Sequence, residues 1–178
     1  KCNCIEDAEI AAQKFRNFIE ISELQPIVNL INILENLGIY IIQIKNLNNR
    51  FKDFDGLSEI VDGIPFIIIL DDIKDGARQR FTIAHELGHL LINCDKDNEE
   101  KLCNRFASAL LMPKKAIINE IGNYRKTISF YEYIAVKAEY KVSYAAINYR
   151  LKDLNIKINL DGSIDELWVA TTGSDTND

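Results

Sequence analysis

Long apolar runs are missing from this chain of 178 residues. The longest uninterrupted apolar run, Ile64–Leu70, covers seven residues, whereas a helix that crosses a bilayer needs about 20. The sequence begins at Lys1, and no basic stretch followed by an apolar one opens it as in a secretory signal. We therefore predict a cytoplasmic protein without a membrane span.

Paired cysteine motifs are also missing. The four cysteines, Cys2, Cys4, Cys94 and Cys103, show no C-x2-C spacing, so we interpret them as free thiols of a reducing compartment. A chain of this length buries roughly 70% of the surface that its unfolded form exposes, and 47% of its residues are hydrophobic. We therefore expect one domain with a small appendage, whose hydrophobic core is large enough to be stable without disulfide bonds.

Charge is unevenly distributed along the chain, whose net charge is -6. Residues 114–157 hold nine Lys and Arg against four acids, a net +5, so the remainder carries -11. A basic region on an acidic protein can contact nucleic acid or an acidic partner, but scattered charges are more typical of a solvated helical surface. We favour the solvated surface.

Hydrophobic periodicity predicts most of the secondary structure. We expect helices over residues 5–19, 25–36, 76–93 and 99–112, with two or three more over 116–154. Strands are expected over 39–44, 56–61 and 64–70, the last two forming a hairpin that turns at Asp62-Gly63. Pro65 indicates a strand edge or a strand start, Pro113 closes a helix, and Ser143 is a candidate N-cap for the last helix.

Only two histidines occur in the chain, and they stand four residues apart in the motif H-E-L-G-H. On a helix this spacing places His85 and His89 on one face, one turn apart, where both imidazoles can bind one metal ion. Glu86 lies on the adjoining face and can act as general base on a metal-bound water. Gly88 is predicted to leave room for a substrate backbone.

A catalytic zinc site needs a third protein ligand, which here must be a carboxylate or a thiolate. Glu100 is our choice for this ligand. Asn104 then lies one turn later on the same helix face, where its side chain can accept a hydrogen bond from the free ring N–H of a metal-binding histidine. Glu99 is the nearest competitor, although its helix face leads into core residues. Cys94 and Cys103 are weaker alternatives and more plausible as small apolar fillers.

Two longer segments carry a resemblance to a known family. The run R-Q-R-F-T-I-A-H-E-L-G-H-L-L (Arg78–Leu91), followed by E-K-L-C-N-R-F-A-S-A-L-L-M-P (Glu100–Pro113), resembles the ImmA/IrrE family of metallo-endopeptidases. The resemblance implies Zn²⁺ bound by His85, His89 and Glu100, with Glu86 as catalytic base. Cys103 stands where the family pattern usually has Ala.

The segment A-E-Y-K-V-S-Y-A-A-I-N-Y-R-L (Ala138–Leu151) is similar to the turn and second helix of a helix-turn-helix. Lys141 occupies the turn position at which a DNA-binding version favours Gly, because the backbone there needs a positive φ. We therefore favour a packing role for this segment over DNA contact.

These observations predict an α+β fold in which a small, mainly antiparallel sheet packs on the zinc-binding HExxH helix, with a helix-turn-helix-like C-terminal part. The predicted division is a metallopeptidase core over 1–113, a helical subdomain over 114–155, and a possible hairpin (156–159 with 164–170) and disordered tail over 156–178.

The predicted function is a zinc-dependent endopeptidase whose Glu86 activates a zinc-bound water. Resemblance to the family implies a protein substrate, a repressor with a helix-turn-helix, and hence a role in transcription regulation. The alternatives are a DNA-binding transcriptional regulator and a protein-binding module with a non-catalytic zinc site. Candidates for stabilising the oxyanion are Arg105 and five tyrosines: Tyr124, Tyr131, Tyr133, Tyr140 and Tyr144.

Overall fold

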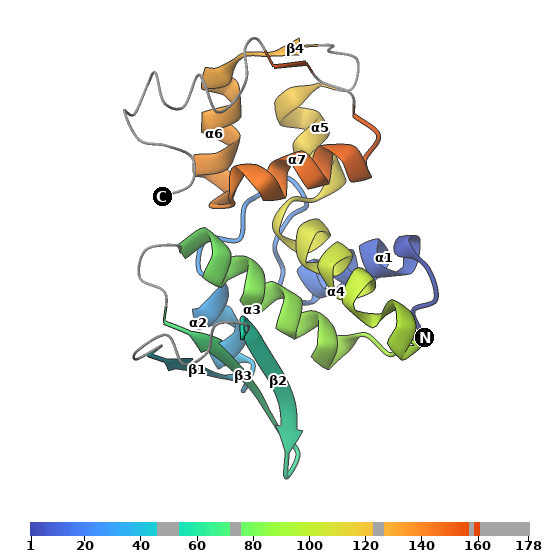
Figure 1. The fold of residues 1–178 in the computed structure, drawn as a ribbon, viewed down its shortest axis with the longest axis vertical. Coiled ribbons are helices and arrows are strands. Elements are labelled where there is room, and N and C mark those ends of the chain that lie inside the picture. Colours follow the sequence, from blue (N-terminus) through green and yellow to red (C-terminus); the bar gives the residue numbers. More distant parts are fainter. Residues whose placement is uncertain (46–53, 72–75, 123–126, 157–158, 161–178) are drawn as a thin grey trace.

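A computed structural model describes residues 1–45, 54–71, 76–122, 127–156 and 159–160 of the chain (Figure 1). The elements run in the order α1 (Ile5–Phe18), α2 (Leu30–Asn36), β1 (Tyr40–Ile44), β2 (Gly56–Val61), β3 (Ile64–Leu70), α3 (Gly76–Leu91), α4 (Lys96–Leu111), α5 (Lys114–Ile121), β4 (Thr127–Ile128), α6 (Phe130–Tyr140), α7 (Tyr144–Asp153) and β5 (Asn159–Leu160). The predicted α+β fold is confirmed, but the expectation of a mainly antiparallel sheet is wrong, because one of the two pairings in the three-stranded sheet is parallel. Within the described ranges, no helix has both the length and the hydropathy that a membrane crossing requires.

The three-stranded sheet has the order β1-β3-β2, with β1 parallel and β2 antiparallel to β3. The hairpin between β2 and β3 turns at Asp62 and Gly63, whose φ angles of 51° and 80° match the primed turns that suit a twisted hairpin. Pro65 lies in the central strand rather than at an edge. It is tolerated because β1 pairs with β3 only from Phe66 onwards, so Pro65 lies near the start of the strand, one residue before that pairing begins.

Two predicted helix starts are wrong. The second helix begins at Leu30 instead of residue 25, because the Asn29 side chain accepts a hydrogen bond from the Asn32 backbone N–H at 3.3 Å and caps the helix there. The helix expected over 99–112 begins at Lys96, since its first turn is polar and solvent-exposed and therefore adds nothing to the apolar periodicity. Glu100 is thus the fifth residue of the helix and not the second.

Helices α3 and α4 form a closely packed antiparallel pair between the sheet and α1 (Figure 1). A Cβ atom built on Gly88 of α3 would lie 3.2 Å from Cα and Cβ of Cys103 in α4, which is tighter than ordinary van der Waals contact. The predicted role of Gly88 is therefore wrong: its missing side chain makes room for α4 and not for a substrate. On the other side, Ile67 and Ile69 of β3 are fully buried in the same core.

The C-terminal part contains three helices, of which α7 lies across the α3–α4 pair (Figure 1). Ser143 caps α7 as predicted, its Oγ accepting from the Ala146 N–H at 3.1 Å. Lys141 adopts the left-handed conformation (φ 51°, ψ 52°) between α6 and α7, so a lysine occupies the turn geometry that usually favours glycine. Whether residues 114–155 fold as a separate unit stays a prediction.

The predicted C-terminal hairpin and tail lie mostly outside the described residues. Of that region, Asn159–Leu160 forms β5, which pairs in parallel with β4 (Thr127–Ile128). The turn at Asp161-Gly162 and the second strand of the expected hairpin are not among the residues described.

A buried arginine anchors α7 to the rest of the molecule. The Arg150 side chain is fully buried, donates to the Met112 carbonyl at 2.8 Å and forms a two-pronged ion pair with Glu9 of α1. Arg105 of α4 joins this network, pairing with Glu9 at 3.2 Å and with Asp153 of α7 at 3.1 Å. The network fixes the position of α7 relative to α1 and α4.

We predict that Glu9→Ala lowers the free energy of unfolding by at least about 2 kcal/mol. Removing one partner of a buried ion pair costs about 3–5 kcal/mol, and Glu9 retains some solvent contact. Chemical denaturation measures the change. The control is Lys14→Ala on the same helix, which is exposed and is expected to shift stability by less than about 0.5 kcal/mol. Equal effects of the two substitutions would contradict the anchoring role of Arg150.

Candidate metal centre

The two histidines of α3 face each other across one helical turn. Their Nε2 atoms lie 3.0 Å apart, with the ring centroids at 4.8 Å. Two zinc–nitrogen bonds of 2.0–2.1 Å at a tetrahedral angle would separate the nitrogens by about 3.3 Å. The spacing of His85 and His89 therefore fits a single metal ion.

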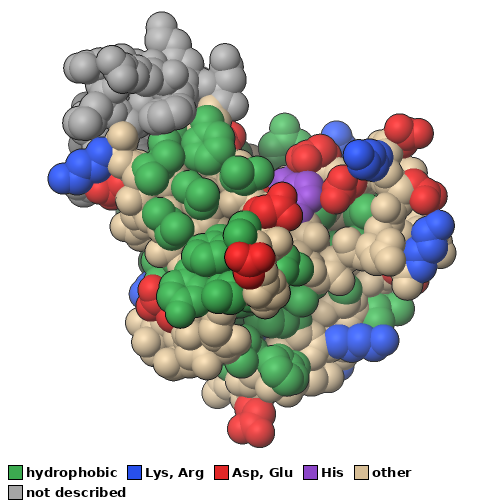
Figure 2. Space-filling model, turned by 90° about the horizontal axis from the view of Figure 1, so that it is seen from below, with side chains coloured by type: hydrophobic (Ala, Val, Ile, Leu, Met, Phe, Trp, Pro, Cys, Tyr) green, Lys and Arg blue, Asp and Glu red, His purple; other side chains and the backbone are tan. Residues whose placement is uncertain are grey.

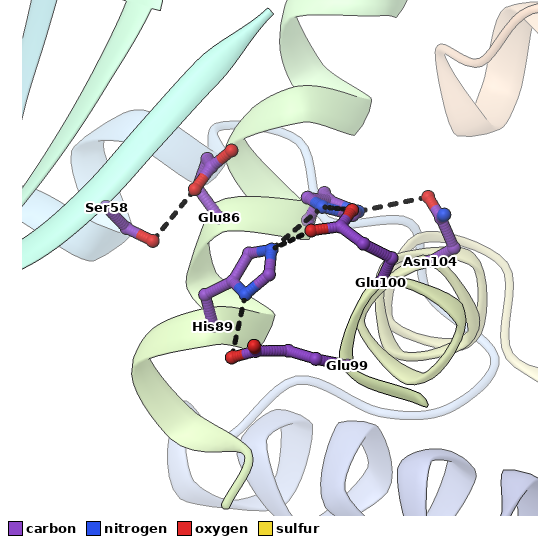
Figure 3. Close-up of polar contacts among 7 residues, drawn as sticks. Ser58, Glu86, His89, Glu99, Glu100 and Asn104 are labelled. Atoms are coloured by element: carbon purple, nitrogen blue, oxygen red, sulfur yellow. Dashed lines mark hydrogen bonds and ion pairs between the residues drawn. The ribbon is translucent and has the colours of Figure 1, made fainter. Parts of the chain in front are cut away.

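Glu100 of α4 completes the cluster (Figure 3). Its carboxylate oxygens lie 3.2 Å from Nε2 of His85 and 3.4 Å from Nε2 of His89. In the described part of the chain, His85, His89 and Glu100 form a group of potential metal ligands whose donor atoms all lie within 4.8 Å of one another. Two imidazoles and one carboxylate are a donor set that catalytic zinc ions use, with a further position left for water or substrate. The residues therefore fit a bound divalent metal.

The outer ring nitrogens have partners from α4. Nδ1 of His85 lies 3.0 Å from Oδ1 of Asn104, and Nδ1 of His89 lies 3.3 Å from Oε1 of Glu99 (Figure 3). When each Nδ1 carries the proton, it donates to its partner and leaves the Nε2 lone pair directed at the shared centre. The Asn104 contact agrees with the sequence prediction.

Glu99 is a site residue that sequence reasoning missed. The sequence analysis weighed it only as a metal ligand and assigned its helix face to the core. That face does lead into the core, since Cys103, Phe106 and Leu110 are buried, but Glu99 lies at its outer end, where its carboxylate reaches Nδ1 of His89.

Glu86 is held against the sheet, apart from the three-ligand cluster. Its side chain is 7% exposed, and its Oε2 accepts a hydrogen bond of 2.8 Å from the Ser58 hydroxyl of β2 (Figure 3). A Cβ on Gly56 would lie 2.9 Å from Oε1 of Glu86 and 2.7 Å from Cγ2 of Thr82. Glycine at this strand position thus permits β2 to approach α3 closely. Neither Ser58 nor Gly56 carries a sequence signal for this role, because the contact is tertiary.

A cleft of about 720 Å³ opens over these residues. Its walls come from the first residues of β2, from α3 and from α4, and both histidines, Glu86, Glu99 and Glu100 line it. Figure 2 shows the histidines (purple) ringed by carboxylates (red) and reachable from solvent. The Glu100 side chain is 75% exposed, whereas His85 and His89 are 15% and 20% exposed. The three potential metal ligands are thus accessible to a polypeptide that lies in the cleft.

The two cysteine alternatives do not join the cluster. Cys103 is buried against Gly88, and burial raises the pKa of its thiol to about 12, which keeps the thiol protonated. Burial also raises the pKa of Cys94. Neither belongs to the group of converging ligands among the described residues. Cys103 therefore acts as the small apolar filler that the sequence suggested.

The suggested oxyanion donors lie elsewhere. Arg105 is engaged with Glu9 and Asp153, and the described tyrosines Tyr131, Tyr133, Tyr140 and Tyr144 do not line the cleft. Tyr124 is outside the described residues. Arg78 of α3 does line the cleft, where it pairs with Asp55. Arg78 stands seven residues before His85, which on one helix places it two turns earlier on the same face, and the sequence reasoning did not use this relation.

Two histidines of an HExxH helix and a glutamate of the next helix form a group of metal ligands, and a small sheet packs behind them. This is the arrangement of a metallopeptidase. The chain matches the model of the IrrE N-terminal-like domain, peptidase M78, over residues 34–152, and it belongs to this family. The ImmA/IrrE resemblance noted in the sequence is thus confirmed.

The chain is also similar to the radiation response metalloprotease IrrE of Deinococcus radiodurans, with 32% identity over 95 residues. This match covers 44% of the chain and 29% of the relative, so the chain corresponds to less than a third of that protein's length.

We predict that Glu99→Ala and Asn104→Ala each lower zinc affinity by about 10–100-fold, because each removes the group that orients a ligand imidazole. Competition with a chromogenic zinc chelator measures the affinity. Asp97→Ala is the matched control, since it removes an exposed carboxylate from the same first turn of α4 without touching a histidine. If Asp97→Ala weakened zinc binding as much as Glu99→Ala, the effect would be one of general charge and not of orientation.

Proposed function

We propose that the protein is a zinc-dependent endopeptidase in which His85, His89 and Glu100 hold the metal and Glu86 is the catalytic base. The observation that carries the proposal is the convergence of these three ligands beside a buried carboxylate that stays outside the ligand set. Membership of the peptidase family supports the same chemistry.

Glu86 has the surroundings that a general base requires. When bound, zinc supplies a Lewis acid that makes a water molecule acidic near neutral pH. Glu86 would take a proton from that water and later return it to the amine nitrogen of the departing peptide. The hydrogen bond from Ser58 fixes one carboxylate oxygen, so the side chain keeps its orientation during both transfers.

The cleft suits an extended polypeptide. β2 is an edge strand, and its residues Gly56, Leu57 and Ser58 line the cleft beside Glu86. An edge strand presents unpaired backbone groups with which a substrate segment can pair. We propose a regulatory protein of the same cytoplasmic compartment as substrate, in particular a helix-turn-helix repressor. The relative's name, a radiation response metalloprotease, connects a protease similar to this chain with a cellular response and supports this choice.

DNA binding is the less well supported alternative. Residues of α7 that a recognition helix would present to a duplex, Ala146 and Tyr149 among them, line a solvent-open cavity against α3 and α4, and Tyr149 is 69% exposed. The net charge of -6 also disfavours a phosphate partner. A mobility shift on mixed-sequence DNA at low salt tests this alternative.

We predict that Glu86→Gln abolishes cleavage while the protein still binds zinc, because the amide cannot accept the water's proton yet leaves all three ligands in place. The assay incubates the purified protein with the repressor-like product of a neighbouring gene, with and without a chelator. We expect the repressor band to disappear only with the unsubstituted protein and available metal, and the rate to fall at least about a thousandfold in the variant.

The matched control is Glu120→Gln, which neutralises an exposed carboxylate on α5 and should cleave at the parent rate. A Glu86→Gln protein that holds zinc and still cleaves like the parent would refute the role of Glu86. Cleavage that survives complete chelation would refute the metal.

A further inference from the structure

A second cavity, which we call the apolar chamber, lies next to the metal cleft. It has a volume of about 860 Å³, lies between α1, α3, α4 and α7, and is open to solvent beside Tyr149, which is 69% exposed. Its apolar walls are Ile5 of α1, Phe81 of α3, and Ala145, Ala146 and Tyr149 of α7. A chamber of this size and lining is typical of a binding site.

The chamber is continuous with the metal cleft. Arg78, Phe81 and Asn104 line both spaces, and Asn104 is the residue whose Oδ1 lies 3.0 Å from His85 Nδ1. One turn of α4 therefore separates the metal ligand Glu100 from the chamber entrance. A chain that lies in the cleft can enter the chamber without leaving the protein surface.

The chamber also contains a buried polar group without a partner. The Ser108 side chain is 5% exposed and lines the chamber, and no other described residue forms a hydrogen bond with its Oγ. Leaving a buried hydroxyl unpaired costs about 1–3 kcal/mol. A peptide carbonyl of a bound segment could accept from this hydroxyl and offset that cost.

The wall formed by α7 is rigidly attached. The fully buried Arg150 ties α7 to Glu9 of α1, and Asp153, which lines the chamber, is paired with Arg105. The chamber therefore exists before any ligand binds. The left-handed turn at Lys141 between α6 and α7 places the first residues of α7 at the chamber.

We propose that the apolar chamber binds a large apolar side chain of the substrate polypeptide, next to the bond that is cleaved, and thereby sets the specificity of the enzyme. The inference rests on the proposed endopeptidase function and deepens it. The polar cleft recognises the backbone and the reacting bond, whereas the chamber selects the sequence. Ser108 donates to a carbonyl of the bound segment and positions it.

The experiment measures peptide binding by fluorescence anisotropy to the zinc-loaded Glu86→Gln protein. Two fluorescein-labelled nonapeptide pools are used, random at every position except the fifth, which is Leu in one pool and Ser in the other. We expect the Leu pool to bind at least about fivefold more tightly, as burying an apolar side chain contributes about 1.5–3 kcal/mol at full burial.

Ala145→Trp, added to Glu86→Gln, should abolish the preference because the indole fills the chamber from an exposed helix position. Lys152→Trp, also exposed on α7 but outside the chamber, should keep it. Ser108→Ala should weaken binding of the Leu pool about threefold and provides a second test should the tryptophan disturb the fold. Circular dichroism checks the folding of each variant.

Equal affinity for the two pools, or a preference that survives Ala145→Trp in a folded protein, would overturn the proposal. A parallel incubation of the unsubstituted zinc protein with the Leu pool, read by mass spectrometry, separates the two claims. A preference for Leu in binding without any cleavage would reject the endopeptidase and retain the chamber. Cleavage with no apolar preference would reject the chamber alone.

Discussion

The close approach of α3 and α4 is the constraint on which the site depends. Gly88 and Cys103 allow the two helices to meet at a distance that larger side chains would forbid. Only at that separation can Glu100 reach both Nε2 atoms while Glu99 and Asn104 reach the two Nδ1 atoms. One helix supplies the imidazoles, and the other supplies the carboxylate together with both orienting groups. The packing of small residues in the core is thus what sets the geometry of the polar site above it.

Electrostatics then explain why this cluster calls for a cation. Three carboxylates, from Glu86, Glu99 and Glu100, surround two imidazoles in a partly buried cleft. Such a concentration of negative charge favours a metal cation at its centre. The surroundings of the carboxylates suit their different proposed roles. Ser58 holds Glu86 against the sheet and away from the ligand set, whereas Glu100 is exposed and lies close to both histidines.

Local patterns in the sequence predicted those parts that depend on short spacings. The pair His85 and His89, the hairpin turn at Asp62-Gly63 and the cap at Ser143 all follow from residues within one or two turns of each other. Glu100 could be proposed as third ligand from its motif and because Asn104, which contacts His85, follows one turn later. What the sequence could not reveal depends on distant segments. Ser58 meets Glu86 across 28 residues, Gly56 and Gly88 are needed for close contacts with other elements, and Glu99 meets His89 only through the packing of α4 on α3.

The C-terminal helices show how one supersecondary unit can be used for a different purpose. The α6–turn–α7 geometry is that of a helix-turn-helix, with a lysine accepting the left-handed turn. The second helix of such a unit is free to enter a DNA groove only if it is solvent-exposed along one side. Here Arg150 on one side of α7 is fully buried, whereas Tyr149 is 69% exposed and, with Ala146, lines a cavity shared with α3 and α4. Because Arg78, Phe81 and Asn104 line both this cavity and the metal cleft, a polypeptide substrate of the proposed endopeptidase would lie beside α7.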